Sequence, residues 1–349
     1  MIARPFERRF AVSLAGLALA LSAAAVLAFT TGALRVPAGE VLAAVTGALR
    51  LPPAAAIDPA AAHVVLFVRA PRVAMAVITG SILGVSGAAI QGTFRNPLAD
   101  PGLLGISSGA ALGAALHIVA GSSLLRGEAA WVFGLPLSAF AGGVGAAALA
   151  GAFGAGAAAR GTAALVLAGV GVNAAAGAGV GLLTHVASDT QLRDLSFWLL
   201  GSLSGATWPR LAVAAPVACA AALVLLRFGR PLNALALGEI EASHAGLRVR
   251  RTRAALLTVA ALGVSATVAV TGPLGFVGLV VPHAARLLFG ADARRVLPAS
   301  ALLGAILLLL ADVAARTLAA PAELPTGIVT AAAGAPFFLL LLRAQRRAA

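Results

Sequence analysis

The chain has 349 residues, of which 60% are hydrophobic and 11% are charged, and its formal net charge at pH 7 is +13. A soluble domain is usually about 25% charged, so this chain has too little polar surface to cover a water-soluble globule. A lipid bilayer must be its main solvent, and in lipid only helices and closed barrels satisfy their backbone hydrogen bonds. The apolar runs are long and lack the alternation of barrel strands, which predicts an all-α membrane protein.

The residue types that are absent or rare exclude several kinds of chemistry. All 25 basic residues are arginines. Because a phosphate-binding Walker loop needs a lysine, this chain cannot hydrolyse ATP by that route alone. The single cysteine, Cys219, excludes an internal disulfide and a zinc cluster. Its apolar neighbours predict a packing role.

Ten apolar segments follow one another along the chain, each close to the roughly 20 residues that cross a hydrocarbon core. The first follows a basic start, as in a signal peptide, but it is long enough to span and we expect it to be the first helix. Small residues within the segments allow close helix packing. We expect one transmembrane domain over 1–349, with spans near 10–31, 64–90, 103–121, 133–155, 163–184, 209–226, 254–271, 274–289, 298–318 and 326–342.

The arginines indicate an orientation. If the N-terminus is cytoplasmic, the inside loops and ends carry 17 of the 25 arginines and the outside carries 8. The positive-inside rule therefore predicts that both termini are cytoplasmic, which agrees with an even number of spans. Since this distribution suits lipid headgroups, the net charge is no sign of nucleic acid, and no such partner is expected.

Three distinctive stretches occur in a fixed order along the chain. They are Arg69-Ala70-Pro71-Arg72 with Gly80, Gly84, Gly87, Gln91 and Arg95-Asn96-Pro97-Leu98-Ala99-Asp100-Pro101-Gly102; Gly272-Pro273-Leu274-Gly275-Phe276 to Pro282-His283 and Arg286; and Asp312, Arg316, Glu323-Leu324-Pro325-Thr326-Gly327 and Gly334-Ala335-Pro336. From about residue 63 onward the chain resembles the FecCD-type permeases, importers of ferric siderophores, haem and cobalamin. The resemblance is strongest to the haem-importing branch.

This resemblance implies a fold and a set of partners. The fold is that of a type II ABC importer permease with about ten helices, located in the bacterial inner membrane. The implied partners are a second copy of the chain, two cytoplasmic ATPase subunits and a periplasmic substrate-binding protein. No permanently bound cofactor is expected, because haem would be cargo and ATP would bind the partner subunits.

The longest inside loop, about 228–253, predicts two short helices hinged at Gly238. Glu239 and Glu241 would open the second near its positive N-terminal end. A short amphipathic element outside the membrane needs a partner groove, and the resemblance implies that the ATPase provides it. The alternative is a loop lying on anionic headgroups, a contact also expected for the arginines at 248–253. The expected coupling residues are Leu235, Leu237, Gly238, Glu239, Glu241, His244 and Gly246.

Arg69, Arg72 and Arg316 fall at outer ends of the second and ninth spans, against the charge rule. The resemblance implies that such outward arginines receive acidic residues of the binding protein, and charge complementarity suits a transient partner. The alternatives are contact with lipid phosphate and, for Arg316, an i,i+4 pair with Asp312. Pairing is the expected role of Asp312, because it is the one acid well inside a span.

The outer segment 185–208 predicts a short amphipathic helix across the outer mouth, and its Gln-Leu-Arg-Asp-Leu run before Phe197 and Trp198 resembles the haem-importing branch. Haem carries two propionates, and arginine binds carboxylates bidentately. Arg193 is therefore a candidate cargo ligand, and Phe197 and Trp198 are candidate contacts for a flat macrocycle. The alternative is a pair of interfacial aromatic residues beside an Arg193–Asp194 surface pair.

We therefore expect a non-catalytic permease that moves haem or a similar iron chelate inward by alternating access. The same machine carrying a ferric siderophore or cobalamin is the alternative. A secondary transporter is less favoured, since it would couple to ions through intramembrane carboxylates and only Asp312 qualifies. An intramembrane enzyme lacks a catalytic constellation here. None of the five histidines pairs with another at ligand spacing, so no metal site is expected.

Overall fold

The structure, a computed structural model, describes residues 3–32, 34–48, 58–121, 130–156 and 161–348. All regular elements of this described part are helical. The π-helical turns are η1 (Val64–Arg69), η3 (His117–Gly121) and η4 (Ala130–Gly134), and η2 (Pro101–Leu104) is a 3₁₀ turn. The α-helices are α1 (Ala3–Thr30), α2 (Ala38–Ala48), α3 (Pro59–His63), α4 (Ala70–Phe94), α5 (Ile106–Leu116), α7 (Leu135–Gly156), α8 (Gly161–Val186), α9 (Asp189–Leu200), α10 (Trp208–Leu226), α11 (Gly229–Leu237), α12 (Glu239–His244), α13 (Val249–Thr271), α14 (Val277–Phe289), α15 (Ala293–Thr317) and α16 (Thr326–Ala348).

Within the described residues, seven helical segments are long and apolar enough to cross a membrane, and each coincides with a predicted span. The other three predicted spans fall on shorter apolar helices, Ile106–Gly121, Val277–Phe289 and Thr326–Leu340. At 1.5 Å per residue the first two are shorter than a hydrocarbon core of about 30 Å, whereas Thr326–Leu340 is the apolar part of the longer helix α16. The all-α membrane fold is confirmed, whereas the number of ten spans is not. The seven are Arg9–Thr30, Pro59–Phe94, Val132–Gly154, Ala163–Val186, Trp208–Leu226, Val249–Thr271 and Ala293–Thr317.

The helix α4 forms the centre of the bundle and makes its largest interface with α15. This contact is close because glycines remove the side chains between the two backbones. A Cβ atom added to Gly80 would lie 2.2 Å from the Gly304 carbonyl oxygen, and one added to Gly87 would lie 1.9 Å from the Gly278 carbonyl oxygen of α14. The small residues read from the sequence thus serve helix packing, as expected in lipid.

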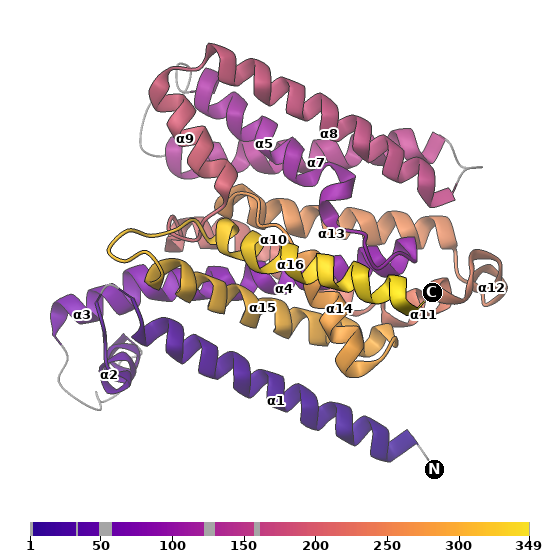
Figure 1. The fold of residues 1–349 in the computed structure, drawn as a ribbon, viewed down its shortest axis with the longest axis horizontal. Helices are drawn as coiled ribbons and strands as arrows, with labels where there is room; N and C mark the ends of the chain where they lie inside the picture. Colours follow the sequence, from indigo (N-terminus) through magenta and orange to yellow (C-terminus); the bar gives the residue numbers. More distant parts are fainter. Residues whose placement is uncertain (1–2, 33, 49–57, 122–129, 157–160, 349) are drawn as a thin grey trace.

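The other helices are arranged around this contact (Figure 1). α10, α13 and α14 also pack on α4, whereas α5, α7 and α8 form a second group joined to the first mainly through α7 and α13. α1 lies along α15 on the opposite flank. The start of α1, the end of α16 and the pair α11–α12 share one end of the bundle, here called the α12 end. α2, α3 and α9 occupy the opposite end, called the α9 end.

Replacing Gly80 by alanine tests the α4–α15 contact. The added methyl group has no room, so Gly80→Ala should lower the free energy of unfolding by about 1–3 kcal/mol. Gly16→Ala is the matched control, because a Cβ there meets no heavy atom of the described chain within 4 Å. It should be neutral or stabilising by about 0.5–1 kcal/mol. Thermal unfolding in lipid nanodiscs measures both, and equal midpoints would contradict the packing account.

Candidate functional site

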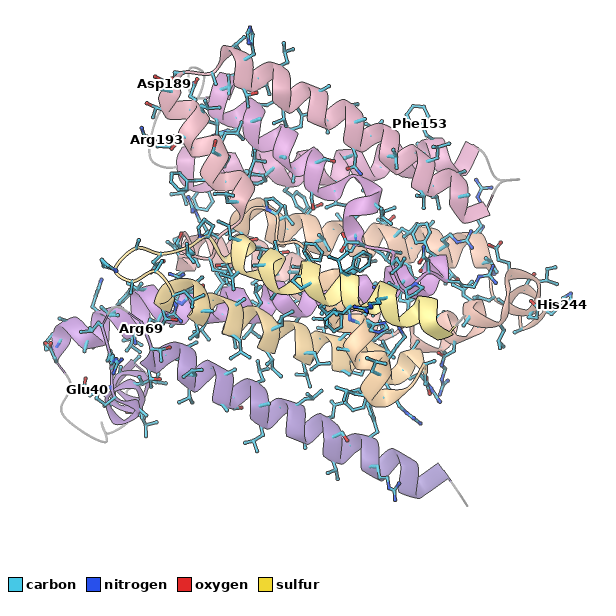
Figure 2. The ribbon with its side chains drawn as sticks, viewed as in Figure 1. Glu40, Arg69, Phe153, Asp189, Arg193 and His244 are labelled. Atoms are coloured by element: carbon cyan, nitrogen blue, oxygen red, sulfur yellow. The ribbon has the colours of Figure 1, made fainter. Side chains whose placement is uncertain are left out.

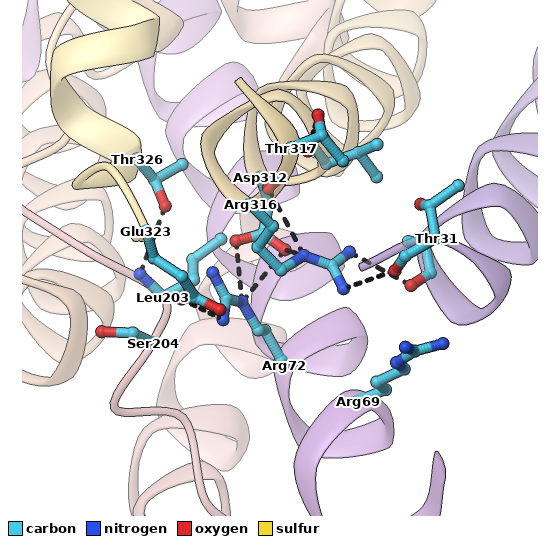
Figure 3. A network of polar contacts seen from close by, with 12 residues as sticks. Thr31, Arg69, Arg72, Leu203, Ser204, Asp312, Arg316, Thr317, Glu323 and Thr326 are labelled. Carbon is cyan, nitrogen blue, oxygen red and sulfur yellow. Dashed lines mark hydrogen bonds and ion pairs between the residues drawn. The ribbon is translucent and has the colours of Figure 1, made fainter. Parts of the chain in front are cut away.

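A buried cluster of charged residues joins α4, α15 and the loop before α16 at the α9 end (Figure 3). Arg72 binds Asp312 through its Nε at 2.9 Å and Glu323 through its Nη1 at 2.8 Å. Arg316, one turn beyond Asp312, binds the same carboxylate at 3.1 Å, which confirms the expected pairing. Arg72, Asp312 and Arg316 are each at most 6% exposed, whereas the Glu323 side chain is 45% exposed. Glu323 is thus the solvent-facing member of the cluster.

Two arginines of this region hold the end of α1. Arg316 donates to the carbonyl oxygens of Thr31 and Ala28, both at 3.1 Å, and Arg69 donates to those of Phe29 and Leu34. The last carbonyl groups of a helix have no partner within it and carry partial negative charge. The guanidinium groups therefore satisfy the end of a helix that is otherwise hardly buried.

The sequence places Arg69, Arg72 and Arg316 at the outer ends of spans, but none of the three is exposed in the structure. All three are buried, because the end of α1, Asp312 and Glu323 lie close enough to bind them. Docking of a binding protein through these arginines stays a prediction. No local pattern in the sequence predicts the pairing of Arg72 with Glu323, because the two residues lie 251 positions apart and only the tertiary structure brings them together.

The expected outer helix is present as α9, and its start is well defined. Ser188 and Gln191 form a reciprocal capping box, and the Gln191 amide donates to the Val119 carbonyl oxygen at 3.2 Å. Leu195 is buried against Ala115 and Ile118. Contacts on one side thus hold α9 across the end of the bundle, while Arg193, on the same helix, is exposed (Figure 2).

A cavity of about 380 Å³ lies beside α9. Phe197 and Trp198 line it together with Asp194 and Glu323, whereas Arg193 does not line it. The indole nitrogen of Trp198 is buried and has no hydrogen-bond partner among the described residues. The cavity therefore combines two aromatic side chains, one unused N–H donor and two acids. Its remaining lining is Ile118, Leu135, Ser202, Ser204, Val270, Thr271, Leu324 and Pro325.

The predicted pair of short helices at the α12 end is confirmed as α11 and α12. Gly238 separates them with φ of 136°, in the region that favours glycine. Glu239 and Glu241 lie in the first turn of α12, as expected from the positive end of a helix. α11 is anchored, because Leu235 is buried and the Asn233 side chain bonds both Asp292 and the backbone N–H of Ala293.

The pair α11–α12 presents an exposed apolar edge at its hinge. Leu237 is 76% exposed and Ile240 is 68% exposed, directly on either side of Gly238 and Glu239. Glu241, His244 and Gly246 are also exposed, and Figure 2 shows His244 at the tip of the molecule. Glu239 in addition binds Arg253 of α13 at 2.5 Å. The element is thus fixed on its inner side and free on its outer side.

Replacing Asp312 by asparagine tests the charged cluster. Asp312→Asn leaves two buried guanidinium groups without their shared counter-ion and should lower the free energy of unfolding by about 3–5 kcal/mol. Glu323→Gln removes only the half-exposed partner and should change it by about 0–1 kcal/mol. Thermal unfolding of both variants in nanodiscs gives the comparison. An equal loss in the two variants would show that Asp312 matters no more to the cluster than Glu323 does.

Three known proteins show what this chain is similar to. The hemin transport system permease protein HmuU of Yersinia pestis is 47% identical over 285 residues, which cover 81% of this chain and 84% of that protein. The cobalamin import system permease protein BtuC of Halobacterium salinarum is 42% identical over 276 residues, or 79% and 72% of the two chains. A solved structure described as an inward-facing ABC transporter of presumed metal-chelate type superposes with a TM-score of 0.82 at 33% identity, over 95% of this chain and 98% of the other.

The model of the FecCD transport family matches residues 8–344. This range contains the charged cluster, the cavity beside α9 and the pair α11–α12, so all three features lie within the family's common part. The match and the identities above lead to one conclusion: this chain belongs to the FecCD transport family, and it is the permease subunit of an ABC importer, which itself hydrolyses no ATP.

Proposed function

We propose that this permease carries haem, or a closely similar iron chelate, into the cytoplasm. The observation that carries the proposal is the 47% identity to a hemin permease, which exceeds the 42% identity to a cobalamin permease. The cavity beside α9 supports it, because Phe197 and Trp198 supply flat apolar surface for a macrocycle. Cobalamin or a ferric siderophore in the same machine is the second candidate, and the cobalamin relative favours it.

The cavity also limits how cargo is held. Its acids, Asp194 and Glu323, would repel the propionates of haem, whereas Arg193 is exposed outside the lining. We therefore place Arg193 at the approach to the cavity, where it attracts carboxylates before the macrocycle meets the aromatic side chains. A permease must release its cargo, and a site without a strong ligand suits that need.

The two ends of the bundle would serve different partners. Exposed arginines gather around α11 and the start of α13, which the positive-inside rule assigns to the cytoplasm; they are Arg227, Arg230, Arg248, Arg250 and Arg251. The exposed edge of Leu237 and Ile240 offers an apolar anchor to an ATPase groove. A periplasmic binding protein would then meet the α9 end, and one of its acids would reach Arg72 only by replacing Glu323.

A second copy of the chain would complete the pathway. A groove of about 1040 Å³ along α5, α7 and α8 is lined by small and apolar residues, including the exposed Ala141, Gly145 and Gly171. Small residues at a lipid-exposed face let another helix approach closely. We therefore propose a homodimer in which this face lies against the partner copy.

Cargo-stimulated ATP hydrolysis tests the proposed cargo. In the complex reconstituted with its ATPase and binding protein, haem should raise the hydrolysis rate, whereas cobalamin or a ferric siderophore should not. Arg193→Ala should weaken the response to haem, because the approach loses its cation, while the basal rate stays unchanged. Stimulation by cobalamin or a siderophore and not by haem would overturn the cargo and leave the permease assignment intact.

Two leucines of α11 test the coupling role. Leu237→Ala should reduce cargo-stimulated hydrolysis and uptake without lowering the thermal unfolding midpoint, because Leu237 is exposed. Leu235→Ala is the contrasting control, since Leu235 is 2% exposed and its truncation should cost about 2–5 kcal/mol of unfolding free energy. Normal coupling in a correctly folded Leu237→Ala permease would argue against this edge as the ATPase contact.

A further inference from the structure

A second polar cavity, of about 250 Å³, lies at the α12 end. It is enclosed by the end of α4, by α11, by α14 and by the start of α15. Two arginines line it, Arg95 and Arg286, together with the side-chain amides of Gln91, Asn96 and Asn233. No carboxylate belongs to its lining in the described part of the chain. The cavity is therefore strongly positive, and it is separate from the cargo cavity beside α9.

Arg286 lies in this cavity with a neutral partner. Its Nη2 donates to the Oε1 of Gln91. Gln91 is 2% exposed, and its amide nitrogen donates in turn to the carbonyl oxygens of Gly278 and Leu279 at 3.4 and 3.3 Å. Gln91 thus orients the guanidinium but cannot neutralise it, and Arg286 forms no ion pair with any described carboxylate. A partly buried charge without a counter-ion is costly. An anion bound in this cavity would remove that cost.

Arg95 brings a second unpaired cation to the same cavity. It ends α4 with φ of 50°, a left-handed conformation that non-glycine residues seldom adopt. Its side chain is exposed and makes no ion pair with a described residue. The next residue, Asn96, uses its Oδ1 to accept from the Leu98 N–H at 2.9 Å, which leaves its amide N–H groups as donors.

The acid nearest to Arg286 along the chain, Asp292, is already engaged. It caps the start of α15, accepts from the Asn233 amide at 2.6 Å and pairs with Arg294 at 2.7 Å. The hydrogen bond from Arg294 holds the pKa of Asp292 well below its ordinary value, so the carboxylate stays ionised and neutralised by its own neighbour. It therefore supplies no counter-charge to Arg286 or Arg95.

We propose that this cavity binds an oxyanion of the phosphate class, with Arg95 and Arg286 as its charged ligands and Asn96 as an amide donor. Arginine suits this role, because its planar fork matches phosphate oxygens bidentately. The source is either inorganic phosphate or the phosphate of an anionic lipid headgroup. Leu232 and Ala236 of α11 share the lining, so the bound anion would tie α11 to α4 and α14 and steady the base of the exposed pair α11–α12.

Phosphate binding to the full chain in nanodiscs tests this site. In nanodiscs of zwitterionic lipid, inorganic phosphate at fixed pH and ionic strength should bind saturably by calorimetry, whereas chloride should not. Arg95→Gln and Arg286→Gln should each weaken phosphate binding at least about tenfold, the loss of one charge-assisted hydrogen bond. Arg227→Gln is the matched control, because Arg227 is exposed beside α11 and does not line the cavity. Binding should also slow amide exchange over 229–237.

A second arm identifies the source of the anion. In phosphate-free nanodiscs that contain phosphatidylglycerol, a headgroup ligand should slow exchange over 229–237 in the native chain and in Arg227→Gln, but not in Arg95→Gln. If only this arm responds, the lipid is the ligand and the site stands. The proposal fails if neither arm shows saturable binding or protection, or if the three variants behave alike. Should Arg286→Gln fail to fold, Arg95→Gln decides, because its side chain is exposed.

Discussion

The close contact of α4 with α15 and α14 is the constraint on which the rest of the structure depends. In lipid no hydrophobic force drives helices together, so they associate where small residues let the backbones meet. Gly80 against Gly304 and Gly87 against Gly278 provide such contacts in the middle of α4. Once these backbones lie side by side, the positions of the helix ends are fixed. Polar side chains lie at both ends of α4, and the packed helices leave them few possible partners.

The polar groups at the two ends of α4 are treated differently. At the α9 end Arg72 finds Asp312 and Glu323, so the buried charges are balanced. At the α12 end Arg286 of α14 donates only to the side-chain amide of Gln91 among the described residues, so its positive charge has no counter-ion there. Burial makes an unbalanced charge costly. The charged cluster at the α9 end therefore stabilises the contact between helices, whereas the residues at the α12 end have the composition of a ligand site.

Two exposed elements, α9 and the pair α11–α12, stand outside this tightly packed centre. Leu237 and Ile240 are exposed on a hinge of Gly238, and Arg193 and Phe197 are exposed on α9. Both elements are nevertheless held from behind, α11 by Asn233 and Leu235 and α9 by its capping box and Leu195. Each element thus has a fixed inner side and a free outer side.

The sequence by itself determined the features that depend on local pattern. Apolar length predicted the long spans, glycine between two short amphipathic runs predicted the hinge at Gly238, and i,i+4 spacing predicted the pair of Asp312 with Arg316. Each needs only residues that are close along the chain.

Only the tertiary structure decided which charges are exposed and which are buried. Arg72 meets Asp312 across 240 positions and Glu323 across 251, and Gln91 meets Arg286 across 195. No local pattern encodes such pairs, since they exist only after α4, α14 and α15 have packed. The sequence alone therefore does not distinguish an exposed arginine near the end of a span from one that pairs with a buried acid or one that lacks a counter-ion. The residues that surround it in the folded chain decide which of these it is.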